Sequence, residues 1–342
     1  MTVKKWAVGS IVALVVIGFG LTVQRFSPHW FTPHAKTLYP GEITIGTEMW
    51  PGYLALFVAD EKGYFKEAGV NVRIKRYPGL GQLSKDYVAG KMQGRANLTL
   101  DAWNEHLSGL DHKIVLAIDY SNGSDAIVAS SDIQTVKDFR GKRVGYEPNT
   151  LEEFFVAWAL RENELDLSDV VPVSGTPEET ARLLKEEKID VAVSHEPFLQ
   201  QFLNSGNFRT VYSSADAPGL VTDVLTFRTD FIEANPETVR VIVKVYFKAV
   251  QFWKDHPDEV AGILAKIFND TSEGMIRQLN GITILDEEDN RTAFTFSAGL
   301  RSLYGNLRQI NEFFRHHQQR KTGLSDTDAI VDRRFIMSAE RG

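Results

Sequence analysis

Short apolar strands that stop abruptly on polar residues are the feature that most constrains the fold of this chain. The apolar segment Val191–Val193 continues directly into the polar tip Ser194–Pro197. Earlier in the chain, the strand-like segment Arg143–Tyr146 is followed by a helix start at Asn149–Glu153. Strands that alternate with helices are typical of a mostly parallel sheet covered by helices. Open sheets of this type bind ligands at the edge where their strands end, so we expect a binding site among these polar residues.

Composition narrows the class of protein further. The chain has 342 residues, of which 43% are hydrophobic and 24% are charged, as in an ordinary globular protein of about two domains. Its net charge of −7 and the lack of a basic patch with interleaved aromatics argue against nucleic acid as a partner. The chain has no cysteine, which excludes disulfides and thiolate metal sites. We expect no metal and no cofactor.

The N-terminus carries a membrane signal. Lys4 and Lys5 precede Trp6–Val23, an uncharged apolar run that as a helix would be about 27 Å long. This length nearly spans the bilayer core of roughly 30 Å. The following residues, 24–33, are bulky and unsuited to cleavage, so we predict an uncleaved anchor, with a cleaved export signal as the alternative. The lysines favour the cytoplasmic side, which places the rest of the chain on the periplasmic side of the inner membrane.

The pattern along the chain predicts an anchor or signal at 1–23 and a tether at 24–41, followed by two lobes in which strands alternate with helices. In the first lobe we predict a strand at Leu98–Leu100 that ends at Asp101. Toward the end of the chain we predict helices near Pro257–Phe268, Arg291–Tyr304 and Asn306–Gln319.

Five segments of the chain carry a family resemblance. They are Tyr53–Phe65, Ile118–Ile127, Asp138–Gly145, Ser194–Leu199 and Asn235–Val239. In this order and at about this spacing they resemble the periplasmic substrate-binding proteins of ABC importers. Within these proteins the chain is similar to the branch shared by nitrate, alkanesulfonate and taurine binding proteins and the NMT1/THI5-like group.

The resemblance implies an α/β fold of the type II periplasmic-binding-protein class. Two doubly wound lobes would be joined by two crossing strands, near Ala126–Ser130 and Val221–Phe227, and would close on a ligand between them. The C-terminal helices would return to the first lobe, so the resemblance implies a first lobe formed by 42–127 with 223–342 and a second lobe at 128–222.

In such a fold the ligand meets loops at the carboxyl ends of strands. The ligand-binding candidates are Glu48, Trp50, Gly79, Asp101, Trp103, Ser121, Asp125, Asn149, Thr150, His195, Glu196 and Asp223. The tryptophans could stack on a flat or cationic ligand, because an aromatic face attracts a cation by ~0.5–2 kcal/mol. The helix that begins at Thr150 could offer backbone N–H groups to an acidic or carbonyl group.

The charge of these candidates bears on the ligand. They include five carboxylates and neither arginine nor lysine: Glu48, Asp101, Asp125, Glu196 and Asp223. Buried unpaired carboxylates repel an anion and pair with an amine, amidine or aminopyrimidine. We therefore favour a nitrogen-containing cationic or neutral donor ligand over a sulfonate or nitrate.

Several candidates also have a purely structural interpretation. Trp50 and Trp103 fit a hydrophobic core equally well, and Gly79 fits a turn before a helix. Asp125 would also serve to bridge the hinge, and Glu196 to end a strand.

We predict a monomeric solute receptor whose partners are a small-molecule ligand and the permease and ATPase of an ABC importer. The alternative role is a membrane-anchored sensor module for a signalling partner. Catalysis is not expected, because the chain has no Gly-x-Ser-x-Gly elbow, phosphate loop or metal motif. The pyrimidine-synthesising enzymes of the resembling family have a cysteine-rich segment, which this chain does not contain.

Overall fold

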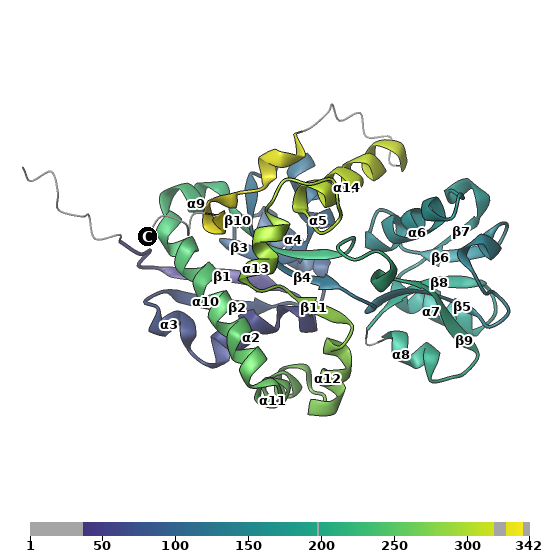
Figure 1. Cartoon of the computed structure of the whole chain (residues 1–342), viewed down its shortest axis with the longest axis horizontal. Helices are drawn as coiled ribbons and strands as arrows, with labels where there is room; N and C mark the ends of the chain where they lie inside the picture. Colours follow the sequence, from purple (N-terminus) through teal and green to yellow (C-terminus); the bar gives the residue numbers. More distant parts are fainter. Residues whose placement is uncertain (1–36, 197, 318–325, 338–342) are drawn as a thin grey trace, which may run out of the picture. The chain divides into compact units, whose positions relative to one another are not determined.

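A computed structural model describes residues 37–196, 198–317 and 326–337 (Figure 1). The chain from Leu38 onward forms one compact unit. The predicted anchor at 1–23 and most of the predicted tether lie outside the described residues. Within the described residues, no helix combines the length and the apolar character needed to cross a membrane.

One sheet has six strands in the order β11-β4-β10-β3-β1-β2 (Figure 1). Its parallel part consists of β1 (Glu42–Thr47), β2 (Asn71–Arg76) and β3 (Gly94–Leu98). Strand β10 (Thr222–Arg228) runs antiparallel between β3 and β4 (His112–Ser121), and β11 (Ile282–Ile284) covers the far edge of β4. Nearly all of β4 is buried, which explains its continuous apolar run.

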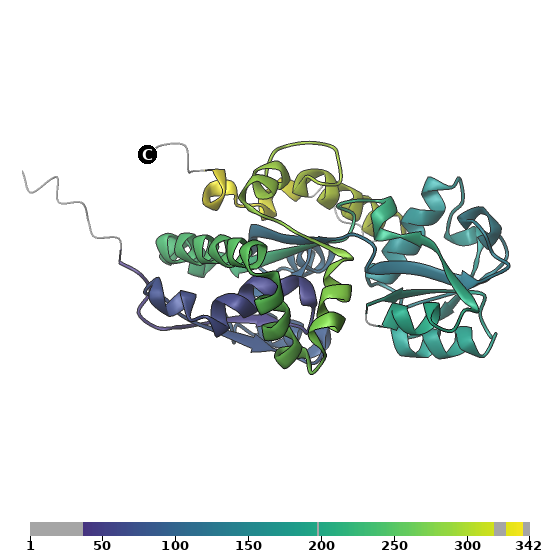
Figure 2. The same ribbon diagram turned by 60° about the horizontal axis from the view of Figure 1, so that its bottom comes forward.

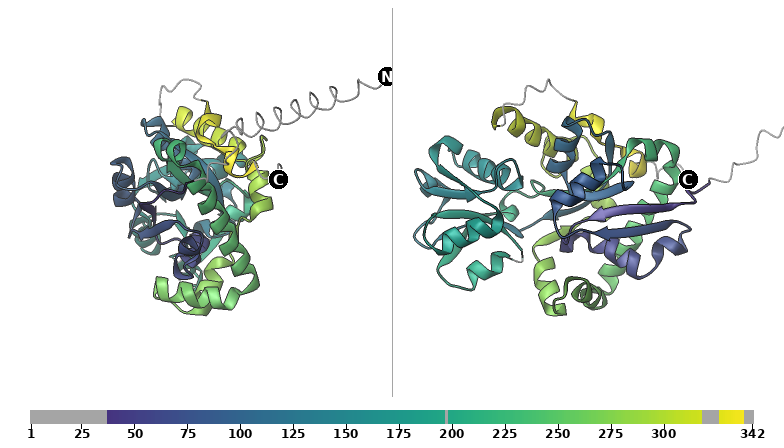
Figure 3. Two further views of the ribbon diagram at one scale, coloured as in Figure 1. Left: turned by 90° about the vertical axis from the view of Figure 1, so that its left-hand side faces the viewer. Right: turned by 180° about the vertical axis from the view of Figure 1, so that it is seen from behind.

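The other sheet has five strands in the order β7-β6-β8-β5-β9. Here β6 (Arg143–Tyr146) lies parallel to β7 (Val171–Ser174) and to β8 (Val191–His195). Strand β5 (Asp125–Ser130) pairs antiparallel with β8 and with β9 (Phe208–Ser213). Figures 2 and 3 show the same two groups of strands and helices from other sides. We call the six-stranded sheet with its helices the first lobe and the five-stranded sheet with its helices the second lobe.

The chain crosses between the sheets twice. It leaves β4 at Ser121 and enters β5 at Asp125, and it returns from β9 to β10 through a single turn of 3-10 helix at Ser214–Asp216. The hydroxyls of Ser121 and Ser214 lie 2.8 Å apart, and the N–H of Gly123 donates to Ser214 Oγ at 2.7 Å. The predicted two-lobed α/β fold with two crossing strands is confirmed. The lobe boundaries at 127/128 and 222/223 stay predictions.

The helices of the first lobe come from both ends of the chain. Helix α2 (Leu54–Glu61) packs against α10 (Pro236–Asp255) and α11 (Pro257–Phe268), and α5 (Thr99–Leu107) packs against α14 (Leu303–His317). The remaining helices of this lobe are α3 (Tyr64–Glu67), α4 (Leu80–Val88), α9 (Thr229–Ala234), α12 (Ser272–Leu279) and α13 (Glu287–Ala293). The second lobe contains α6 (Leu151–Glu162), α7 (Pro177–Lys185) and α8 (Phe198–Leu203).

Two sequence predictions of local structure are wrong. Residues 99 and 100 belong to α5 rather than to a strand, because Leu100, Trp103 and Leu107 share one apolar side at helical spacing. The predicted helix at Arg291–Tyr304 ends at Ala293, and α14 begins only at Leu303. The intervening residues 294–302 include Gly299 and two serines, which favour irregular backbone.

Candidate functional site

An acidic cluster joins the two lobes around Glu48, the residue that follows β1. Burial, helped by the negative charges of Asp223 and Asp101 and opposed by Arg95 and His195, raises the pKa of Glu48 to about 7. Asp223 lies on β10 and Asp101 in the first turn of α5, whereas His195 ends β8 of the second lobe. Three of the predicted site residues therefore act electrostatically on a fourth, Glu48.

Asp125 continues this cluster into the second lobe. It is the cross-strand partner of His195, and its pKa is raised by burial, with His195 acting in the opposite direction. Burial also raises the pKa of nearby Glu152 to about 7, with help from the charges of Glu147 and Asp125. Glu196 is buried next to His195 and donates its backbone N–H to the Ser124 carbonyl at 2.9 Å.

The start of α6 already holds carboxylates of its own. Thr150 is the N-cap and accepts from the Glu152 N–H at 3.2 Å. The backbone N–H groups of Glu147 and Asn149 donate to the carboxylates of Glu152 and Glu153, both at 2.7 Å. An anionic ligand at Asn149 or Thr150 would have to displace these carboxylates.

Side-chain hydrogen bonds hold Trp50 and Asp223 in place within the first lobe. The Trp50 indole donates to Asp119 at 3.3 Å, and the Tyr53 hydroxyl donates to Asp223 at 2.7 Å. Ser121 is fully buried and accepts from the Asp125 N–H at 3.2 Å. Ser121 therefore stabilises the crossing turn.

The contacts of two predicted site residues, Trp103 and Gly79, differ from those of the cluster around Glu48. Trp103 is fully buried, where its ring stacks on His106 with the ring centres 5.3 Å apart and its indole donates to Asn311 at 3.3 Å. These contacts favour the structural interpretation of Trp103. Gly79 is the N-cap of α4, and no atom lies within 4 Å of the position that a side chain there would occupy.

Sequence reasoning missed a buried cation, Arg95. Its side chain is fully buried, donates to Ser84 Oγ at 2.8 Å and forms an ion pair with Glu105. One of its terminal nitrogens, Nη2, lies 3.8 Å from Asp101 Oδ2. We predicted this strand at Leu98–Leu100, whereas β3 begins at Gly94. Arg95, the second residue of β3, was therefore overlooked. The run Gly94–Leu98, with its strand length between polar stretches, was the available signal.

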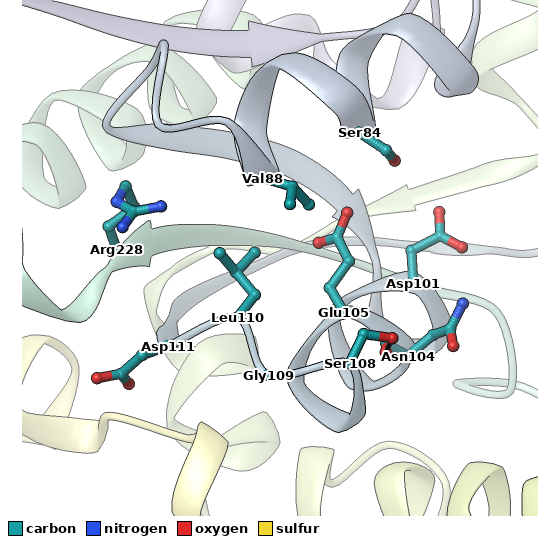
Figure 4. Close-up of a pocket in the computed structure, with 10 residues that line it drawn as sticks. All are labelled: Ser84, Val88, Asp101, Asn104, Glu105, Ser108, Gly109, Leu110, Asp111 and Arg228. Atoms are coloured by element: carbon teal, nitrogen blue, oxygen red, sulfur yellow. Dashed lines mark hydrogen bonds between the residues drawn. The ribbon is translucent and has the colours of Figure 1, made fainter. Parts of the chain in front are cut away.

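A groove of about 520 Å³ extends from Asp101 between α4 and α5 (Figure 4). Asp101 and Glu105 point from α5 toward the side of α4 that carries Ser84, and Arg228 lies at the other end. Burial raises the pKa of Glu105 to about 7, although Arg95 acts against this rise. The other lining residues are Val88, Asn104, Ser108, Gly109, Leu110 and Asp111. Among all described residues, no group of three or more acidic or histidine side chains is arranged to hold a metal ion.

The strand orders and the two crossings define a protein of the periplasmic-binding-protein fold. The family model described as "NMT1/THI5 like" matches residues 50–260, and the chain belongs to this family.

Named relatives agree with this assignment. A Bacillus subtilis protein named as an aliphatic sulfonates-binding protein is 28% identical over 244 residues, which are 66% of this chain and 69% of the relative. The periplasmic aliphatic sulphonate binding protein from Escherichia coli superimposes with a TM-score of 0.68 at 14% identity, over 82% of this chain and 89% of that one. The periplasmic nitrate-binding protein from Synechocystis PCC 6803 gives a TM-score of 0.62 at 14% identity, over 86% of each chain.

Proposed function

We propose that this protein is an extracytoplasmic solute-binding protein of an ABC importer, which captures a small polar ligand between its two lobes. The observation that carries the proposal is the acidic cluster around Glu48, to which both lobes contribute. A ligand that contacts Glu48 and His195 together would link the first lobe to the second. Closure of the two lobes would then offer a permease a surface that the open form does not have.

The favoured ligand is a nitrogen-containing cation or neutral hydrogen-bond donor. Asp223 acts on Glu48 and Asp125 acts on Asp223, and burial raises the pKa of each of the three carboxyls. A bound cation would offset the cost of ionising these groups, whereas an anion would add to it. The contacts proposed for the ligand are those of Glu48, Trp50, Asp101, Asp125, His195 and Glu196.

A sulfonate or nitrate ligand is the second candidate. The names of two relatives favour it, and so does Arg95, which brings positive charge next to Asp101. In the described structure this guanidinium is already paired with Glu105, so an anion would have to compete with that carboxylate.

The proposal also covers the protein's lack of catalysis, its oligomeric state, its location and its partners. The binding-protein names of the relatives support a role without catalysis. We propose that the chain acts as a monomer on the periplasmic side of the inner membrane, held there by residues 1–23 and served by a permease and an ATPase.

A binding panel tests the proposal. The purified full chain is screened by thermal shift against amines, amidines, aminopyrimidines, sulfonates, nitrate and bicarbonate. A ligand at 100 times its Kd stabilises a fold by ~2.7 kcal/mol, which raises Tm by several degrees. We expect a shift with a nitrogenous cation. A shift with sulfonate or nitrate alone would favour the second candidate.

A charge-reversal variant ties any such shift to the acidic cluster. Glu48→Lys places a cation among Asp101, Asp223 and His195, and should abolish the response to a cationic ligand. The matched control is Glu288→Lys on the exposed side of α13, which should keep the response. Equal ligand responses in both variants would show that Glu48 is not part of the binding site.

A further inference from the structure

Two buried aspartates face each other on neighbouring strands of the first lobe. Asp119 of β4 and Asp223 of β10 are cross-strand partners, and their side chains are 0% and 3% exposed. Directly opposed residues on antiparallel strands have Cβ atoms about 4.5–5.5 Å apart, and the pKa of each carboxyl depends on the other. Two carboxylates this close in a buried site cannot both ionise without a large cost, so one proton is expected to remain on the pair.

The pair is clamped by one short segment of the chain, Trp50–Tyr53. The Trp50 indole donates to Asp119 Oδ2 at 3.3 Å, and the Tyr53 hydroxyl donates to Asp223 Oδ1 at 2.7 Å. Gly52 lies between them, and a Cβ at this position would come within 2.2 Å of Asp119 Oδ2. The backbone therefore packs directly onto the carboxyl of Asp119.

One oxygen of the pair indicates where the proton lies. Asp119 Oδ1 is buried and accepts no hydrogen bond from any residue in the described part of the chain. A buried oxygen without a partner costs about 1–3 kcal/mol. A proton shared with Asp223 would give this oxygen a hydrogen bond.

The groups that act on the pair supply no positive charge that could take the place of that proton. The titratable groups that act on the two carboxyls or on their partners are Tyr53, Glu48, Asp125 of β5 and Tyr246 of α10. These groups are acidic or neutral. Arg95 and His195 act to lower the pKa of Glu48. Burial raises the pKa of Asp119 to about 8, and burial together with the charge of Asp119 raises the pKa of Asp223.

We propose that Asp119 and Asp223 share one proton and act as positioning residues, which hold the segment Trp50–Tyr53 and thereby place Glu48 and Trp50 for the ligand. This role rests on the proposed function, since the placement matters only if the segment meets a ligand. When the proton is lost at alkaline pH, the two charges repel each other and the segment is released.

The sign of the linkage follows from the raised pKa values. Above about pH 4 and up to its raised folded pKa, the folded pair keeps a proton that the unfolded chain has released, so stability falls as the pH rises through this range. Above the folded pKa the folded pair has lost the proton as well, and this contribution stops changing. One such proton makes the unfolding constant rise tenfold for each pH unit.

The test compares wild type with Asp223→Asn and Asp119→Asn, using the full chain without ligand. Each amide can donate to the remaining carboxylate, so the variants form the hydrogen bond without the proton. The unfolding constant of wild type should rise about tenfold more per pH unit between pH 5 and 8 than that of either variant. The control is Asp332→Asn, which removes a buried carboxylate paired with Arg334 and should keep the wild-type slope.

A second measurement reports on position. The indole N–H signal of Trp50, assigned with Trp50→Phe, should move in wild type between pH 7 and 9 and stay fixed in the two asparagine variants. Equal slopes in wild type and variants, or a Trp50 signal that does not move in wild type, would overturn the proposal. Neither readout uses a ligand, so the shared proton can be established even if the binding panel fails. The wild-type Trp50 titration decides the question if neither variant folds.

Discussion

At the scale of single residues, Gly52 shows why a backbone position near the site tolerates no side chain. A Cβ there would lie 2.2 Å from Asp119 Oδ2 and 2.3 Å from the Trp50 indole nitrogen. We expect Gly52→Ala to lower stability by about 1–3 kcal/mol, as overpacking in a well-packed interior does. Gly81→Ala in α4, where no atom lies within 4 Å, is the control and should leave Tm unchanged or slightly higher. Equal melting temperatures for the two variants would contradict the close packing at Gly52.

The buried ion pair between Arg95 and Glu105 leads to a second prediction at this scale. Breaking a buried ion pair by removing one partner typically costs 3–5 kcal/mol, because the other charge is left buried alone. Arg95→Met should therefore lower the free energy of unfolding by about this amount, and Arg95→Met with Glu105→Leu should recover much of the loss. Both are measured by denaturant unfolding. Arg182→Met, which breaks the exposed pair with Glu186, serves as control and should cost less than about 1 kcal/mol. A loss no larger for Arg95→Met than for this control would show that the buried pair adds little.

At the scale of elements, the sequence predicted best where local chemistry and period agree. Helix α11 begins at Pro257 and ends at Phe268, as predicted, with proline in its first turn and Asn269 in the left-handed region at its end. The start of α5 was missed because Leu98, Leu100 and Ala102 also fit the alternation of a strand. Leu98 ends β3, whereas the helical spacing of Leu100, Trp103 and Leu107 and the packing of α5 against α14 place Leu100 and Ala102 in the helix.

Asn290 links two such distant elements and can be tested directly. Its side chain accepts from the Ala117 N–H and donates to the Ala117 carbonyl, both at 2.9 Å, and so joins α13 to the buried strand β4. Asn290→Ala would leave both backbone groups buried and unpaired, at a cost of about 2–4 kcal/mol. The exposed Asn204→Ala is the control and should change stability by less than about 0.5 kcal/mol. If both variants melt together, the contact between α13 and β4 does not depend on this side chain.

At the scale of the whole molecule, the two lobes were predictable from a family resemblance, and the composition of the site was only partly so. Glu48, Asp101, Asp125 and His195 were chosen because they follow or end predicted strands, and Asp223 because it lies on the predicted return crossing. In the structure Asp101, Asp223 and His195 act on Glu48, and His195 acts on Asp125. Asp119 and Arg95 were missed because both lie inside strands. An inward-facing charged residue within a strand is revealed only by what it meets across the sheet.

The sign of the ligand's charge is the last prediction, and it depends on both lobes. The pKa of Glu48 is about 7 without ligand, so this carboxyl is half ionised near neutral pH. A cationic ligand binds best when Glu48 is ionised. Its affinity should rise by up to tenfold per pH unit below about pH 7 and level off above it. For a sulfonate or nitrate the trend reverses, because binding favours the protonated carboxyl. The measurement is Kd by calorimetry from pH 5.5 to 9, with ligands that do not titrate in this range. Glu48→Gln should flatten the profile and Glu288→Gln should preserve it. A wild-type profile that Glu48→Gln leaves unchanged would place the ligand away from Glu48.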